Sequence, residues 1–144
     1  MGEVIQFVPK APAIVPADEL AEIIAWIKPA KNWRIGQMQI ALAYHHYMTA
    51  DYRRILASDA HGKDSAAAKE HAELSRRAFR VWNVECLKQV FIPAACVRHL
   101  RWKEDWLKRH GGGTPETALA IDRDKDALAG RLRPFAGRAK VALS

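Results

Sequence analysis

Apolar residues recur along most of this chain at the three- and four-residue spacing that is typical of amphipathic α-helices. A first helix is expected to begin near Pro16–Asp18 and to end at Pro29, with an apolar stripe formed by Leu20, Ile23, Ile24 and Ile27. A second helix is predicted over about 33–58, with Asn32 as a plausible N-cap. Its expected inward face consists of Met38, Ala41, Leu42, His45, Met48, Tyr52, Ile55 and Leu56.

A third and a fourth helix are predicted on the two sides of Pro93. Asp64 or Ser65 can cap the third helix, which is expected to run to about Ile92 before Pro93 kinks or splits it. The fourth helix is expected to end near His110, because three consecutive glycines follow. The inward set of the third helix is predicted to be Leu74, Ala78, Val81, Val84, Leu87 and Phe91, with Trp82 and Cys86 beside them.

A fifth, weaker helix is predicted after the glycines, with Thr114 as its N-cap and Pro115 as its first residue. No segment shows the period-two alternation of a strand, so we expect an all-α fold, a small bundle of four main helices plus the C-terminal one. The predicted organisation is an extended proline-containing arm (1–16), a helical bundle domain (17–110), and a glycine connector with a short helix and a basic tail (111–144).

The composition is that of an ordinary soluble globular protein, since 49% of the 144 residues are hydrophobic and 27% are charged. Cys86 and Cys96 would lie about 15 Å apart on one helix, too far for a disulfide. Reduced thiols and the absence of a signal-peptide pattern or an 18-residue apolar run favour a cytoplasmic location without a membrane span. The many alanines and arginines are typical of GC-rich bacterial genomes or their phages.

The net charge of +7 is spread unevenly along the chain. Basic and acidic residues balance over 1–60, whereas 61–110 carries eleven Lys and Arg against six Asp and Glu. From Ala127 onward there are four basic residues and no acidic one. A basic half and a basic tail favour polyanionic partners such as nucleic acid, although many basic proteins bind none.

No motif indicates catalysis, a cofactor or a metal. His45 and His46 are adjacent, so on a helix their side chains point about 100° apart and cannot share one metal ion. The sequence "GGGTPET" precedes a helix, but it lacks the strand and the Gly-Lys-Ser/Thr ending of a phosphate loop. We therefore expect a protein that is not an enzyme and that needs neither metal nor cofactor.

The strongest candidate for a binding surface is a set of basic and tryptophan residues on the third and fourth helices. It consists of Arg76, Arg77, Arg80, Arg98, Arg101, Trp102, Lys103, Trp106, Lys108 and Arg109. Arg98, Trp102, Trp106 and Arg109 follow one another along one side of the fourth helix, while Val97, Leu100 and Leu107 serve the core. Acidic residues can neutralise part of this charge, because Glu104 can pair with Lys108 and Arg101 with Asp105.

Three interpretations of the tryptophans stay open at this point. They can cover the loose end of the bundle, anchor a protein partner, or stack on unpaired bases. For the whole protein, the leading hypothesis is a non-catalytic binding or regulatory module that acts through protein–protein interaction, with a homodimer through the long third helix as one form. The alternative is a nucleic-acid-binding protein that uses the basic Trp/Arg surface.

Overall fold

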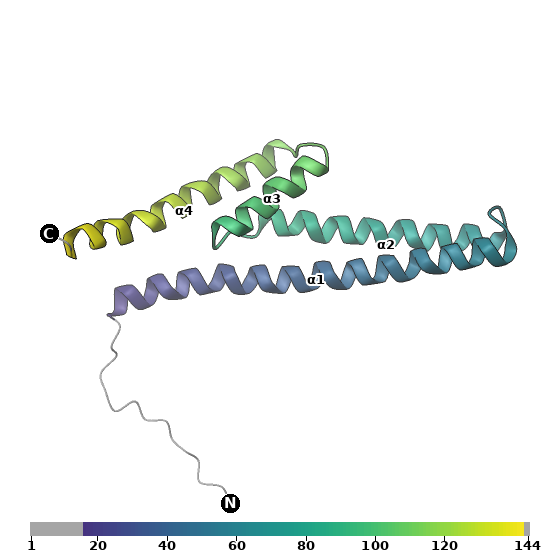
Figure 1. Ribbon diagram of the computed structural model, residues 1–144, viewed down its shortest axis with the longest axis horizontal. Coiled ribbons are helices and arrows are strands. Elements are labelled where there is room, and N and C mark those ends of the chain that lie inside the picture. Colours follow the sequence, from purple (N-terminus) through teal and green to yellow (C-terminus); the bar gives the residue numbers. More distant parts are fainter. Residues whose placement is uncertain (1–15, 143–144) are drawn as a thin grey trace, which may run out of the picture.

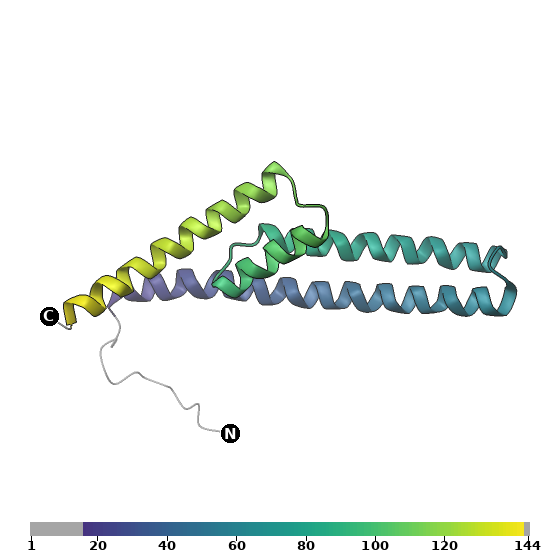
Figure 2. The ribbon, with the colours of Figure 1, turned by 45° about the horizontal axis from the view of Figure 1, so that its top comes forward.

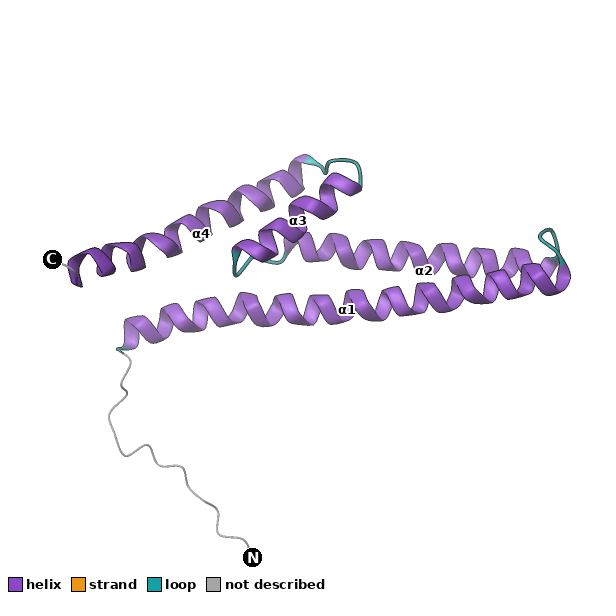
Figure 3. Cartoon of the chain, in the orientation of Figure 1, coloured by secondary structure: helices purple, strands orange, loops and turns teal. Residues whose placement is uncertain are grey.

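Four helices make up nearly all of the described chain (Figures 1 and 3). The computed structural model describes the backbone of residues 16–142 and the side chains of residues 16–25 and 27–130. The helices are α1 (Ala17–His61), α2 (Ala66–Phe91), α3 (Val97–Arg109) and α4 (Pro115–Ala142), and no strand forms within these residues. The predicted all-α fold is confirmed, while residues 1–15 of the expected arm lie outside the described residues.

The helix α1 continues through Pro29, so the prediction of two separate helices here is wrong. Proline lacks an N–H and crowds the carbonyl group four residues earlier, but its fixed φ angle is compatible with a helix. One lost hydrogen bond therefore leaves the helix continuous, and Asn32 lies inside it instead of capping it. With 45 residues, α1 is about 68 Å long.

Three helix boundaries follow the local signals in the sequence. The Ser65 hydroxyl accepts a hydrogen bond of 3.1 Å from the backbone N–H of Ala68, which caps α2 as predicted. The helix α2 ends two residues before Pro93, and α3 ends where Gly111, Gly112 and Gly113 adopt positive φ angles of 94°, 88° and 87°.

The helix α4 begins as expected but is longer than expected. Thr114 caps it, because its hydroxyl accepts a hydrogen bond of 3.3 Å from the N–H of Thr117, and Pro115 is the first helical residue. The prediction of a short helix is wrong, since the backbone stays helical over 28 residues, to Ala142. The backbone of the predicted basic tail is thus helical as far as Ala142 and continues α4.

The helices α1 and α2 form a long antiparallel hairpin whose seam is built from small residues (Figure 1). Alanine or glycine recurs every seven residues along α1, at Gly36, Ala43, Ala50 and Ala57, and Ala43 and Ala57 are buried. Ala68 and Ser75 are buried on the α2 side. Small residues at these positions allow the two backbones to approach closely, and between them Tyr47 of α1 packs against Phe79 and Trp82 of α2 with ring centroids 5.2 Å and 5.6 Å apart.

The hydrophobic core lies at the opposite end of the hairpin from its loop, where α3 and α4 pack on the end of α2 (Figure 2). Its buried members are Val90, Ala94, Leu100, Leu107, Ile121 and Leu128, and Trp102 and Trp106 pack against them. The three inward faces predicted for α1 and α2 are therefore wrong for their large residues. Those side chains are exposed: Leu20, Ile23, Ile24, Ile27, Met38, Leu42, Met48, Tyr52, Ile55, Leu56, Leu74, Val81, Val84, Leu87 and Phe91.

Candidate functional site

The helix α3 divides the predicted Trp/Arg surface between the core and the solvent. Leu100 and Leu107 are buried, as predicted, whereas Val97 is exposed. Trp102 and Trp106 are half-buried against the core, so they cover the end of the helical bundle at least in part. The basic residues of α3 that remain exposed are Arg98, Arg101, Lys108 and Arg109.

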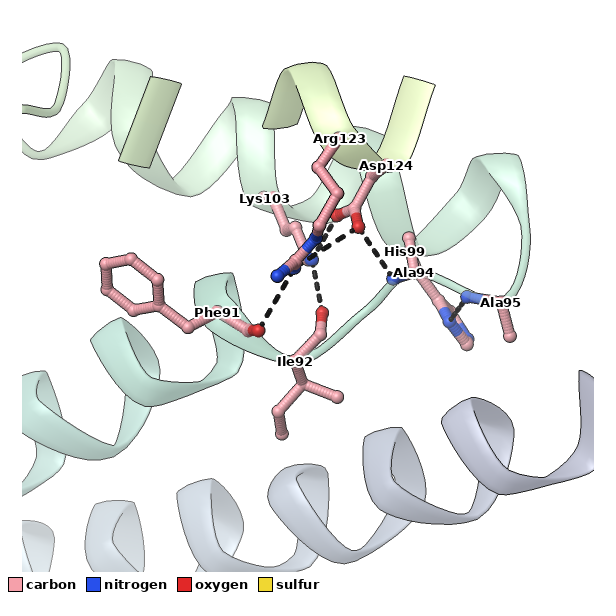
Figure 4. A network of polar contacts seen from close by, with 8 residues as sticks. All are labelled: Phe91, Ile92, Ala94, Ala95, His99, Lys103, Arg123 and Asp124. Atoms are coloured by element: carbon pink, nitrogen blue, oxygen red, sulfur yellow. Dashed lines mark hydrogen bonds and ion pairs between the residues drawn. The ribbon is translucent and has the colours of Figure 1, made fainter. Parts of the chain in front are cut away.

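Lys103 does not belong to that surface, which corrects the prediction for this residue. Its side chain is 0% exposed, and its ammonium group pairs with the carboxylate of Asp124, which is 1% exposed (Figure 4). The same ammonium group donates to the backbone carbonyl oxygen of Ile92, and Asp124 accepts 3.2 Å from the N–H of Ala94. Burial lowers the pKa of Lys103, and the hydrogen bond and negative charge of Asp124 oppose that shift.

The Lys103–Asp124 ion pair holds three segments together, since α3 and α4 supply the charges and the loop between α2 and α3 supplies the backbone groups. Arg123 adds a further link from α4, because its guanidinium donates to the carbonyl oxygen of Phe91 at 3.2 Å. The backbone groups that Pro93 leaves without helical partners are thus bound by charged side chains. This cluster serves the architecture of the bundle, and every charge in it has a partner.

His99 connects the bundle end to α1. Its imidazole ring stacks on Trp33 with centroids 4.1 Å apart, and Trp102 meets Trp33 edge to face at 5.5 Å. The Nδ1 atom of His99 accepts a hydrogen bond of 3.2 Å from the N–H of Ala95. Burial lowers the pKa of His99, and the positive charges of Arg98 and Lys103 lower it further.

The arginines of α2 and those of α3 share no contact partner, because the ion pairs of the α2 arginines form within α2. Arg76 and Arg77 both pair with Glu73, at 2.8 Å and 3.2 Å, and these exposed pairs fix their side chains on the helix surface. The pairing with both arginines lowers the pKa of the Glu73 carboxyl group. Arg80 has no ion-pair partner within the described chain.

One groove does bring residues of the predicted surface together across two helices. It has a volume of ≈ 680 Å³ and lies along α2 beside α3. Arg76 and Arg80 line it together with Phe79, Tyr47 and Trp106. The groove is open and mainly apolar, and the hydroxyl group of Ser75, the buried polar residue in its lining, donates to Asp51 at 3.1 Å.

The acidic residues of α3 leave the exposed basic residues unpaired. The pairs expected between Glu104 and Lys108 and between Arg101 and Asp105 do not form within the described chain. Arg109 turns back to the carbonyl oxygen of Asp105, at 3.3 Å. The positive charge of this helix is therefore available to an outside partner.

The most extensive unpartnered surface is an apolar face of α1, which we call the α1 stripe. It runs at helical spacing through Ile35, Met38, Leu42, His45, Thr49, Tyr52 and Leu56. Met38 and Tyr52 are 65% and 62% exposed. Met38, His45 and Tyr52 follow the seam positions Gly36, Ala43 and Ala50 by two residues, so they point about 200° away from the seam, on the side of α1 that faces away from α2. The other four members of the stripe each precede a seam position by one residue and form the flank of this face.

The α1 stripe contains no charged residue, although charged residues flank it. The charged residues between positions 35 and 56 are Asp51, Arg53 and Arg54, and only Arg53, four residues after Thr49, lies at the edge of the stripe. Asp51 and Arg54 pair with each other at 2.7 Å, and the hydrogen bond from Arg54 lowers the pKa of Asp51. The hydroxyl group of Thr49 donates to the carbonyl oxygen of His45 at 2.9 Å, so this polar member of the stripe is satisfied within the helix.

The corresponding outer face of α2 is charged over its first four turns. Glu70, Glu73, Arg77 and Arg80 lie on it at helical spacing, and all are exposed. Such a mixture of signs is typical of a face in contact with water. The first four turns of α2 therefore present a charged outer face, although Val81, Val84 and Leu87 are exposed farther along the same helix.

Sequence reasoning identified the residues of the α1 stripe as apolar but assigned most of them to the core. The signal that it missed is the second series on the same helix, Gly36, Ala43, Ala50 and Ala57, because small residues carry little weight in a hydrophobic pattern. A helix with small residues on one face and large apolar residues on the opposite face can pack either face against a neighbouring helix. Only the packing shows that the small ones face α2.

Side chains that could bind a metal ion or act as nucleophiles are dispersed over the described part of the chain. No group of three or more His, Cys, Asp or Glu side chains within it is placed to hold a metal ion. Cys86 and Cys96 are both free thiols there, and burial raises the pKa of Cys86. Among the described residues, no helix has the length and apolar character to cross a membrane.

With this geometry established, comparison with known proteins adds no relative. No protein family, no curated protein and no solved structure matches this chain.

Proposed function

We propose that this protein is a non-catalytic interaction module and that the α1 stripe is the surface with which it binds another protein chain. The observation that carries the proposal is the exposure of the large apolar residues of α1, several of which are about half exposed or more. Monomeric proteins rarely expose a long contiguous apolar surface, and such surfaces mark interaction sites. Covering one such side chain contributes roughly 1.5–3 kcal/mol when burial is complete.

The shape of the surface supports a helical partner over a small ligand. The α1 stripe is a straight row about 33 Å long between positions 35 and 56, with one side chain every three or four residues. A second helix can lie along such a row and insert its own side chains between those of α1. We place the interaction in the cytoplasm, where free thiols such as Cys86 and Cys96 stay reduced.

Site-specific photo-crosslinking in living cells tests the proposal. A benzophenone amino acid introduced at Met38, in the α1 stripe, is expected to form covalent adducts with a protein chain upon irradiation. The matched control carries the same amino acid at Arg77, on the charged outer face of α2, and should form few adducts. Equal and low adduct yields at the two positions would show that the α1 stripe is not a protein interface.

Nucleic-acid binding through α3 is the second candidate. The observation in its favour is that Arg98, Arg101, Lys108 and Arg109 are all exposed and form no ion pair within the described chain. Free basic side chains can contact phosphates and release counterions. The half-burial of Trp102 and Trp106 limits how far these rings can stack on bases, so this candidate depends on the charges.

The fluorescence anisotropy of labelled single-stranded and duplex DNA, measured over a range of salt concentrations, tests this second candidate. We expect Arg98→Glu with Arg101→Glu to weaken binding and to reduce the slope of log K against log salt by about 2. Lys69→Glu, an exposed charge reversal on α2, serves as the control and should leave the slope nearly unchanged. A wild-type protein that binds neither DNA at low salt removes the candidate.

A further inference from the structure

A repeating line of residues on α1 carries opposite charges at its two ends. Every seventh residue from position 31 lies on the same face, which gives the series Lys31, Met38, His45, Tyr52 and Asp59. All five are exposed, and neither Lys31 nor Asp59 has an ion-pair partner within the described chain. The series is basic at one end, acidic at the other, and uncharged between.

This series matches itself when it is turned end to end. In an antiparallel pair of α1 helices centred near His45, Met38 of one copy lies opposite Tyr52 of the other, and Lys31 lies opposite Asp59. Two-fold symmetry repeats each of these contacts, so two ion pairs flank a seam without charged residues in which Met38 meets Tyr52 and the two His45 side chains face each other at the centre. We infer that the partner of the α1 stripe is a second copy of this chain, with the two α1 helices packed antiparallel. The inference rests on the proposed function and names its partner.

The charges also select the orientation and the register of the pair. A parallel arrangement would place Lys31 against Lys31 and Asp59 against Asp59, which is unfavourable. An antiparallel pair that overlaps along the entire helix would bring Asp59 close to Asp18 and Glu22. Sliding one helix by twelve residues relative to the other instead brings Asp59 opposite Lys31 and close to Lys28, which are both exposed.

The remaining polar groups permit this arrangement. Thr49 keeps its hydrogen bond to the His45 carbonyl oxygen, so covering it leaves no unsatisfied hydroxyl group. In this arrangement the α2 helices lie on the far sides of the paired α1 helices, because Met38, His45 and Tyr52 face away from the seam with α2. The charged outer faces of α2, with Glu70 and Arg77, therefore stay in water.

Charge reversals at the two ends test the inference by sedimentation equilibrium. The wild-type protein is expected to be a dimer, and Asp59→Lys alone or Lys28→Asp with Lys31→Asp should each weaken self-association by about tenfold, since like charges then meet at both ends. A mixture of the two variants should form a heterodimer about as tight as the wild-type dimer. In the mixed pair, a lysine faces an aspartate at both ends again.

The mixing step separates a defect in association from a defect in folding, because a misfolded variant cannot be rescued by its counterpart. Glu70→Lys, on the outer face of α2, is the matched control for Asp59→Lys and should leave the dimer unchanged. A wild-type protein that stays monomeric at about 100 µM, a concentration at which even a weak dimer of micromolar Kd would form, overturns the inference. Crosslinks from Met38 to a different protein in the same cells would then still support the proposed function. A dimer in which neither reversal changes the affinity would also overturn the antiparallel register.

Discussion

The ammonium group of Lys103 and the carboxylate of Asp124 are buried where α3 and α4 meet the loop that follows α2. A charge removed from water is costly, and its partner offsets that cost only while both are present. Here the backbone groups of Ile92 and Ala94 take up the remaining hydrogen bonds. The ion pair therefore fixes the position of α4, which has few other contacts with the hairpin.

Replacing one member of this ion pair should destabilise the protein strongly. We expect Lys103→Ala to lower the free energy of unfolding by about 3–5 kcal/mol, because the buried Asp124 would keep only the half-exposed Arg123, at 3.5 Å, as a counter-charge. Urea titration followed by tryptophan emission measures the change at a fixed protein concentration. Lys108→Ala, an exposed lysine on the same helix, is the control and should cost no more than about 0.5 kcal/mol.

A double replacement sharpens the test of the same ion pair. Lys103→Met combined with Asp124→Asn removes both charges and nearly keeps the side-chain volumes, and the asparagine oxygen can still accept from Ala94, so it should cost less than Lys103→Ala alone. If Lys103→Ala were as mild as Lys108→Ala, the buried ion pair would not exist in solution.

At the scale of the elements, the close approach of α1 and α2 depends on small residues at the seam between them, and most of all on Gly36. A Cβ atom built on Gly36 would lie 1.8 Å from Oε1 of Gln89 and 2.9 Å from Cδ1 of Ile92. Gln89 is fully buried and donates a hydrogen bond of 3.0 Å to the carbonyl oxygen of Trp33, so it has little room to move. Gly36 therefore sets how closely α1 and α2 approach each other near the bundle end.

The helix α4 offers a matched glycine for an experiment on this contact. Gly36→Ala should lower the free energy of unfolding by about 1–3 kcal/mol despite the better helix propensity of alanine, because the seam is overpacked. Gly130→Ala places its Cβ in open space and should raise it by up to about 1 kcal/mol. Thermal unfolding of both variants measures the two effects, and a gain in stability from Gly36→Ala would contradict the close seam.

At the scale of the whole molecule, burial is concentrated at one end and exposure along the rest. The core around Val90, Leu100 and Leu107 joins α2, α3 and α4, whereas the hairpin extends from it with little apolar area buried in its own seam (Figure 2). A two-helix unit can bury one face of each helix and no more. The outer face of α1 can be covered only by a further helix, and a second copy of the hairpin would supply one. We therefore treat the self-association of α1 and the proposed function of the protein as one hypothesis.

The tertiary structure also changes the extent of the two surfaces on which the proposals rest. It separates the arginines of α2 from those of α3, pairs Arg76 and Arg77 with Glu73, and buries Lys103. The basic surface that the sequence suggested is thereby reduced to the exposed part of α3. The apolar surface, in contrast, is larger than the sequence suggested, because residues expected in the core lie outside it.

The sequence by itself determined the all-α fold and most of the helix ends. These depend on local chemistry: Ser65 and Thr114 bind the first N–H groups of their helices, Pro93 withholds a donor, and three glycines accept positive φ angles. The one local signal that misled was Pro29, since its cost is a single hydrogen bond that a long helix can bear.

Only the tertiary structure decided which face of each helix is buried. Periodicity shows that α1 has a face of small residues and a face of large apolar ones, but it does not show which of them contacts α2. The choice depends on how closely two backbones can approach, and at Gly36 the packed partner, Gln89, lies 53 residues away in the sequence. The burial of Lys103 beside Asp124 was likewise beyond local reasoning, because the two charges meet only after α4 has folded back onto α3.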